Sequence, residues 1–264
     1  RSDITTEIDA FDFGSLSSLQ YTNSSEGIYL ALDALRNVTD PANLKVIVFF
    51  TDGAPNTFAS EFDFVGTSTN YTGAIRSSDE SSGTPRGLWY HDAIATQLPG
   101  SGYEGSDIDD YIAELPDYYT AHSASATEFN VLNPSHPDRP FTQYNTSTHS
   151  ANDLYIRVNR VARNLLEDIA TAARGEDIYV FTLGLGSSLT SSTGPDNEQG
   201  EDLLMRMAND PRMLDDADLA GDFRADQLQG VYCHAVDEEA LGPCFDEMLD
   251  LSLIHISEPT RQHH

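Results

Sequence analysis

The sequence predicts an α/β protein with a doubly wound, Rossmann-like, mostly parallel sheet. Apolar and β-branched runs that fit buried strands occur at 45–51, 178–183 and 230–235. Segments in which apolar residues repeat at helical spacing alternate with these runs. Such alternation indicates parallel strands joined by right-handed helical crossovers.

The first helix is predicted over 23–37. Its apolar residues Ile28, Ala31, Leu32 and Leu35 repeat at helical spacing. Asn23, followed three residues later by Glu26, fits a capping box at the start of this helix.

The first strand is predicted over 45–51, with the sequence KVIVFFT. A run that is apolar on both faces is typical of a central strand in a parallel sheet. The run stops at Asp52 and Gly53, which predicts a sharp turn at the carboxyl end of the strand.

The second half of the chain is predicted to add helices over 152–174, 201–209 and 238–251 and strands over 178–183 and 230–235. Gly175 is a good stop for the first of these helices, and Pro243 is expected to shift the start of the last helix or kink it. The side chains predicted to face inward are Val158, Val161, Ala162, Leu165, Leu166, Ile169, Ala173, Leu203, Leu204, Met207, Leu241, Phe245, Met248 and Leu249.

An insertion is predicted between these two halves. Residues 57–150 are rich in Ser, Thr, Asp, Tyr, Gly and Pro, and only 108–115 looks helical. A structureless loop of this length is improbable within a compact domain, so we expect a lobe or an elaborate loop. The predicted organisation is therefore one domain formed by 1–56 and 151–251, interrupted by the insertion.

The C-terminal residues 252–264 are set apart from the fold. The stretch from Ser252 to Arg261 resembles a translated sequencing-library adapter, and such scars are excluded from fold reasoning. We therefore expect the chain to be a fragment open at both ends, from assembled environmental DNA.

The net charge excludes several classes of function. The chain has 14 Lys+Arg against 43 Asp+Glu, a formal charge of −29, and the suspect tail contains one acid and one base, so its removal leaves that charge unchanged. A nucleic-acid partner requires a basic face, and an anionic membrane surface would repel this protein. We interpret the acidity as a solubility feature of a salty or extracytoplasmic setting, with cation capture as the alternative.

The two cysteines, Cys233 and Cys244, have no zinc-site spacing. Their positions on a predicted strand and the following helix favour two buried free thiols. A disulfide is the alternative if the domain lies outside the cytoplasm.

Asp52 and Thr22 are the candidate metal ligands. Asp52 directly follows a buried strand, where α/β proteins place ligand-binding residues. Thr22 lies in the loop that enters the preceding helix, and its hydroxyl reaches the same crevice if both loops share one edge of the sheet. Carboxylate and hydroxyl oxygens suit Mg²⁺. The alternatives are an ordinary turn residue for Asp52 and a helix cap for Thr22.

Three segments resemble von Willebrand factor A domains. They are LQYTNSSEGIYLALDAL (19–35), KVIVFFTDGAPN (45–56) and IYVFTLGLG (178–186). The longer stretch from 158 to 186, together with LLMRMANDP and QLQGVYCHAVDEEALGPCFDEML, resembles the A domain of TadG-type proteins. Those proteins belong to the tight-adherence, or Flp, pilus-assembly group.

The resemblance implies a non-enzymatic adhesion domain that binds a protein partner through a metal-ion-dependent adhesion site. Thr22 and Asp52 match two of the family's three ligand loops. The third, a DxSxS loop, does not occur at the right offset in the sequence and is expected upstream of Arg1. The family's N-terminal membrane helix, which holds the A domain outside the cytoplasm in the cell envelope, is expected there too.

Two other hypotheses compete with that of a metal-dependent adhesion domain. In the first, the chain is a phosphatase-like hydrolase, with Asp52 as nucleophile or metal ligand and the insertion as a substrate lid. In the second, it is a structural A domain with an inactive metal site.

Overall fold

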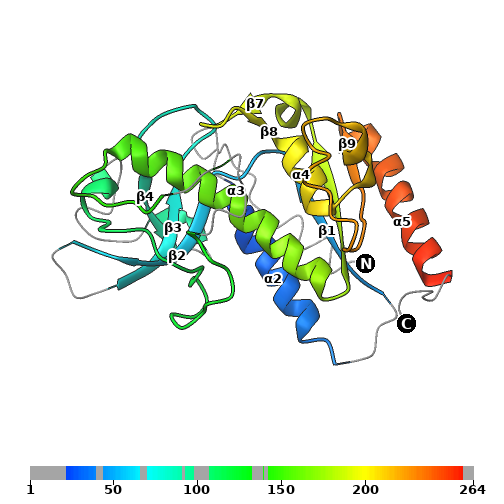
Figure 1. Cartoon of the computed structure of the whole chain (residues 1–264), viewed down its shortest axis with the longest axis horizontal. Coiled ribbons are helices and arrows are strands. Elements are labelled where there is room, and N and C mark those ends of the chain that lie inside the picture. The colour runs from blue at the N-terminus through cyan, green and yellow to red at the C-terminus, as the bar shows by residue number, and fades with distance from the viewer. Residues whose placement is uncertain are drawn as a thin grey trace.

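The computed structural model describes residues 22–39, 44–65, 70–90, 93–97, 107–132, 139 and 142–257. Three strands form a parallel sheet in the order β1-β6-β9 (Figure 1). They are β1 (Lys45–Thr51), β6 (Ile178–Leu185) and β9 (Tyr232–Ala235). Lys45 pairs with Ile178, and Thr182 pairs with Tyr232.

Helices cover both faces of this sheet. On one face, α2 (Ser24–Arg36), α3 (Ala151–Gly175) and α4 (Gly200–Ala208) share a core with the side chains of Ile47 and Val180. On the other face, α5 (Leu241–Ser257) packs against alternate residues of β6 and β9. The predicted α/β class with a parallel sheet is therefore confirmed for the described residues.

The strand predicted to be central lies at an edge of the described sheet. β6 occupies the middle position, and β1 has no partner among the described strands on its other side. The side chains of Val48 and Phe50 are 48% and 52% exposed on the face that α5 covers elsewhere. A continuous apolar run shows that a strand is apolar on both faces, but it does not give the strand's position in the sheet.

The long helix α3 is predicted most accurately. Its observed bounds lie within one residue of the predicted ones, and all seven predicted inward residues are buried. Ser150 and Asp153 form a capping box at its start, because each side chain accepts a hydrogen bond from the other residue's backbone N–H. The prediction of inward Leu203, Leu204 and Met207 on α4 is also confirmed.

The last helix differs from its prediction. A 3₁₀ turn, η4 (Glu238–Ala240), precedes α5, and Pro243 lies in the first turn of α5, where its missing N–H has no intrahelical role. Met248 faces inward as predicted, but Phe245 and Leu249 are 47% and 60% exposed. Cys244 is buried beside Met248, and Leu241 packs against the same cluster as predicted, because the helix meets the sheet on only one narrow face.

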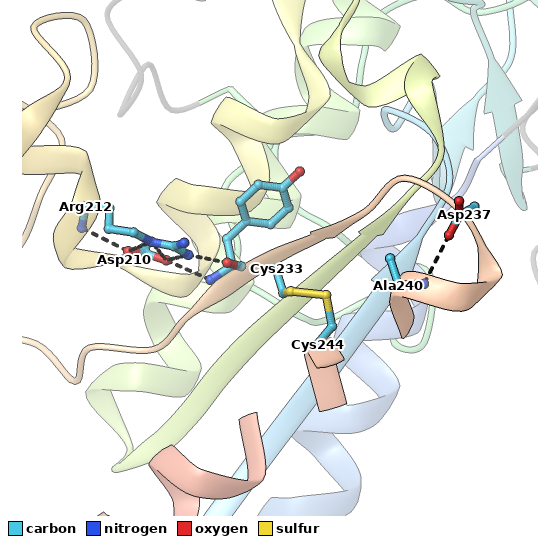
Figure 2. The surroundings of a disulfide bond; sticks show 7 residues. Asp210, Arg212, Cys233, Asp237, Ala240 and Cys244 are labelled. Carbon is cyan, nitrogen blue, oxygen red and sulfur yellow. Dashed lines mark hydrogen bonds and ion pairs between the residues drawn. A yellow bond between two sulfur atoms is a disulfide. The ribbon is translucent and has the colours of Figure 1, made fainter. Parts of the chain in front are cut away.

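The prediction of free thiols is wrong. Cys233 on β9 and Cys244 on α5 form a disulfide with a Cα–Cα distance of 5.6 Å (Figure 2). The predicted elements were correct, but a strand followed directly by a helix that packs on it also brings two cysteines into bonding range. Asp237 caps the intervening turn by accepting a hydrogen bond from Ala240 N–H.

The insertion contains its own antiparallel sheet. Its strands are β2 (Thr57–Asp63), β3 (Asn70–Arg76), β4 (Arg86–Tyr90) and β5 (Ala93–Gln97), in that order across the sheet. The predicted helix at 108–115 is wrong: only a 3₁₀ turn, η1 (Asp107–Asp110), forms there. Ile108 and Ile112 are nevertheless buried.

The insertion shares its core with the rest of the protein. Phe58, Phe62 and Leu88 belong to the same buried cluster as the apolar face of α3, which extends from the insertion to the parallel sheet (Figure 1). Its position relative to the parallel sheet is thus fixed by packing.

A buried ion cluster also joins the insertion to α3, α4 and the short hairpin of β7 (Ser192–Thr193) and β8 (Glu198–Gln199). Its central side chains, between 1% and 13% exposed, are Arg139, Arg163, Glu167, Glu198 and Arg206. The remaining 3₁₀ turns are η2 (Ser187–Thr190) and η3 (Pro211–Asp215). Among the described helices, none combines the length and apolar character needed to cross a membrane.

Candidate functional site

Asp52 lies at the carboxyl edge of the parallel sheet, directly after β1. The preceding Thr51 shapes the turn through two hydrogen bonds with Gly53. Thr51 Oγ1 donates to Gly53 O at 2.9 Å, and Gly53 N–H donates to Thr51 Oγ1 at 3.3 Å. Ser188, from the turn after β6, donates its hydroxyl to the Asp52 carbonyl. The Asp52 side chain is exposed, and no hydrogen bond to its carboxylate occurs in the described part of the chain.

The structure brings the Thr22 loop against this turn. A methyl group placed on Gly53 would lie 3.7 Å from Thr22 Oγ1, so the hydroxyl faces the backbone next to Asp52. Thr22 N–H donates to Asn56 Oδ1 at 2.9 Å, and Asn56 N–H donates to Thr22 O at 3.2 Å. The two predicted site residues therefore lie on neighbouring loops, and their role as metal ligands stays a prediction.

The donor set suits a hard cation. Thr22 and Asp52 offer a hydroxyl and a carboxylate oxygen, and Mg²⁺ is bound by few protein oxygens with several waters. Beside Thr22 in the sequence, the buried hydroxyl oxygen of Ser24 has no hydrogen-bond partner among the residues that the structure describes. A buried polar group without a partner is uncommon and indicates an ordered water, an ion or a functional role at that position. The residues present therefore fit a hydrated cation, which Thr22 and Asp52 would hold.

Many metal sites in proteins consist of three or more acidic, histidine or cysteine side chains. Among the residues that the structure describes, no such group is arranged to hold a metal ion. The candidate site is of another kind, because one of its two ligands is the hydroxyl of Thr22. It therefore depends on two protein oxygen donors and water.

The predicted capping box of α2 does not form. Asn23 makes no side-chain cap, and the Glu26 carboxylate instead contacts the insertion. It accepts a hydrogen bond from Tyr119 Oη at 2.7 Å and pairs with His122 Nε2 at 2.9 Å. Burial, together with the charge of Glu26, raises the pKa of Tyr119, so its hydroxyl stays a donor. Local spacing suggested a cap, but two distant side chains bind the carboxylate more directly.

Sequence reasoning missed Asn56 and Ser188, which link the Asp52 turn to neighbouring loops. It also missed an acidic cavity of about 320 Å³ in the insertion. Hydroxyl groups of Ser and Thr line this cavity together with four carboxylates, those of Glu61, Asp63, Glu114 and Asp117. These acids come from two segments, 61–63 and 114–117, that are distant in the sequence, and no short motif connects the two segments.

Comparison with known proteins adds no family assignment. No protein-family model, curated protein or solved structure gave a significant match to this chain. The class that the structure defines is an α/β protein with a parallel three-stranded sheet, compatible with a Rossmann-like fold.

Proposed function

We propose that this chain is a non-enzymatic protein-binding domain of the von Willebrand factor A type, related to TadG-type proteins of pilus assembly. One observation carries the proposal: the Thr22 loop is hydrogen-bonded to the Asp52 turn at the carboxyl edge of the parallel sheet. Ligands of open α/β sheets bind at this edge. The proposal of this family is supported by the TDG turn and by the order of the sequence segments that resemble von Willebrand factor A domains.

The proposed ligand of this edge is a partner protein, bound through Mg²⁺. Thr22 Oγ1 and the Asp52 carboxylate would hold the ion. When bound, Mg²⁺ would supply a Lewis-acidic centre able to attract a carboxylate of the partner. The exposure of Asp52 supports this role, because an ion that contacts both Asp52 and a partner has to be accessible from outside.

The proposed location is the cell envelope, outside the cytoplasm, with a membrane anchor upstream. The disulfide between Cys233 and Cys244 supports it, since such bonds persist in oxidising compartments. The acidic composition is consistent with a surface that stays soluble in a salty extracytoplasmic setting. It also argues against nucleic acid as the partner.

Calorimetric titration with Mg²⁺ and Mn²⁺ tests the proposal. Binding heat should be present for the wild type and lost in Thr22→Ala and Asp52→Asn. Thr190→Ala is the matched control, because Thr190 donates to Ser187 O in a neighbouring turn and is not a proposed ligand. Equal heats in the wild type and both site variants would contradict metal binding at this edge.

The hydrolase alternative has its own test. The wild type should release no product from a generic phosphoester such as p-nitrophenyl phosphate, with or without Mg²⁺. Turnover that disappears in Asp52→Asn would replace the adhesion proposal by the hydrolase.

A further inference from the structure

Asn56 occupies a special position four residues after Asp52. It is 1% exposed, and its side chain acts toward Thr22 as a backbone peptide group would. Asn56 Oδ1 accepts from Thr22 N–H at 2.9 Å, while the Asn56 N–H donates to Thr22 O at 3.2 Å. This reciprocal pair closes the Thr22 loop onto the Asp52 turn across 34 residues of sequence.

The orientation of the Asn56 amide is set by its partners. A backbone N–H only donates, so Oδ1 has to face Thr22, and Thr57 Oγ1 also donates to Oδ1 at 3.1 Å. The amide nitrogen is then directed at Asp79 Oδ1, to which it donates at 3.1 Å. Asp79 lies between β3 and β4, so an acceptor from the insertion completes the arrangement.

The insertion also holds the backbone of Asn56. Ser77 N–H and Ser77 Oγ both donate to Asn56 O, at 2.8 and 2.7 Å. Asp79 is itself fixed, because Gly194 N–H donates to its carbonyl at 2.7 Å. Asn56 therefore joins three parts of the molecule: the Thr22 loop, the Asp52 turn and the insertion.

We propose that Asn56 is the positioning residue of the Thr22–Asp52 site, and that Asp79 of the insertion holds its amide in the required orientation. Asn56 and Asp52 lie on one short turn, so anchoring Thr22 to Asn56 sets the separation of the two oxygen donors. The insertion thereby becomes part of the site's support. What the site binds rests on the proposed function; the positioning of Thr22 does not.

Amide hydrogen exchange at Thr22, followed by NMR, tests the positioning directly. Asn56→Ala removes the acceptor of the Thr22 N–H, so exchange at Thr22 should become about tenfold faster, as expected for the loss of one hydrogen bond. Amides of β6 should exchange as in the wild type. Asn130→Ala is the control, because Asn130 Oδ1 likewise accepts a backbone N–H, that of Leu132, within the insertion.

A donor–acceptor swap keeps the test decisive if Asn56→Ala does not fold. Asn56→Asp removes the donor and sets two carboxylates against each other, so Thr22 protection should fall. Asn56→Asp with Asp79→Asn restores one donor facing one acceptor, and protection should return. A purely structural loss of packing would not be rescued by this second substitution.

Unchanged Thr22 exchange in Asn56→Ala, or a double variant no better protected than Asn56→Asp, would overturn the proposal. A parallel Mn²⁺ titration distinguishes the positioning role of Asn56 from cation binding at the Thr22–Asp52 site. If the wild type binds Mn²⁺, Asn56→Ala should weaken the affinity at least tenfold, and unaltered affinity would overturn the positioning role. If the wild type binds no Mn²⁺, the proposed function fails, and the exchange data alone decide on Asn56.

Discussion

Replacement of Glu198 by glutamine should destabilise the folded chain by about 3–5 kcal/mol, the usual cost of removing one partner from a buried charge pair. The Glu198 side chain is 13% exposed and pairs with Arg163 at 2.8 Å and with Arg206. The ion cluster contains three guanidinium groups against Glu167 and Glu198. The variant leaves these three positive charges facing one buried carboxylate within the cluster, and the more exposed Asp222 lies 3.9 Å from Arg206.

Urea unfolding followed by circular dichroism measures this loss. Glutamine preserves the volume and one acceptor oxygen, so the change in unfolding free energy reports the charge. Glu176→Gln is the control, because Glu176 is 40% exposed and pairs with the half-buried Arg36. An exposed pair should contribute at most about 1 kcal/mol. If both variants lose the same small amount, the distinction between buried and exposed pairs fails here.

The pH dependence supplies an independent check. Burial alone would raise the pKa of Glu198, but the charges of Arg139, Arg206 and Arg163 outweigh burial and hold it below its usual range. A depressed folded-state pKa gives stability that is complete above the unfolded value of about 4.3 and disappears as the pH falls through the folded value. The difference between wild type and Glu198→Gln should therefore stay constant near neutral pH and narrow below about pH 4. A difference that is unchanged at pH 3 would refute the charge argument.

Three further predictions concern stability, each measured by chemical unfolding. Gly230→Ala should cost about 2–4 kcal/mol, because the added methyl would lie 2.0 Å from Val180 O, whereas Gly221→Ala, with open space, should change stability by about 0.5 kcal/mol or less. Burial raises the pKa of Asp202 to about 6, above its unfolded value, so its ionisation opposes folding as the pH rises through 6. Asp202→Asn should thus stabilise the protein by roughly 1 kcal/mol at pH 8, after allowance for solvent screening, and by nothing at pH 4. Replacing both cysteines by alanine should cost about 2–3 kcal/mol for a disulfide that spans 11 residues, and the native chain should contain no titratable thiol.

The α/β framework could be predicted because its signals are local. The seven predicted inward residues of α3 and its stop at Gly175 lie within one continuous segment, and the predicted bounds follow from them. The strands β1 and β6 are apolar on both faces and end at glycine-containing turns. Each of these signals depends on residues that are neighbours in the sequence.

The insertion could not be predicted in the same way. Its strand β2 buries Thr57 and Ser60 beside Phe58 and Phe62, so no alternation of apolar and polar residues marks it. Ser60 is satisfied by contacts with residues 118 and 120, about sixty positions away. Packing against distant segments decides which of these polar residues are buried, and sequence spacing does not contain that information.

The candidate site also combines residues with local signals and residues with distant partners. Thr22 and Asp52 could be proposed from the sequence because they lie beside a predicted helix and a predicted strand. Asn56 lies in the same motif, but its role depends on Asp79 and Thr22, which are distant in sequence. A turn asparagine is ordinarily explained by local turn geometry, so nothing nearby distinguishes this one.

We expect the Thr22–Asp52 edge of the parallel sheet to bind a divalent cation. With a net charge of −29, the chain attracts cations over its whole surface, so the location of binding matters more than its heat. Substoichiometric Mn²⁺ broadens NMR signals of nearby amides even when binding is weak. We predict selective broadening at Thr22 and Gly53 that disappears in Asp52→Asn. Broadening centred instead on the acidic cavity around Glu61 and Glu114, or spread evenly over the surface, would contradict cation binding at the Thr22–Asp52 edge.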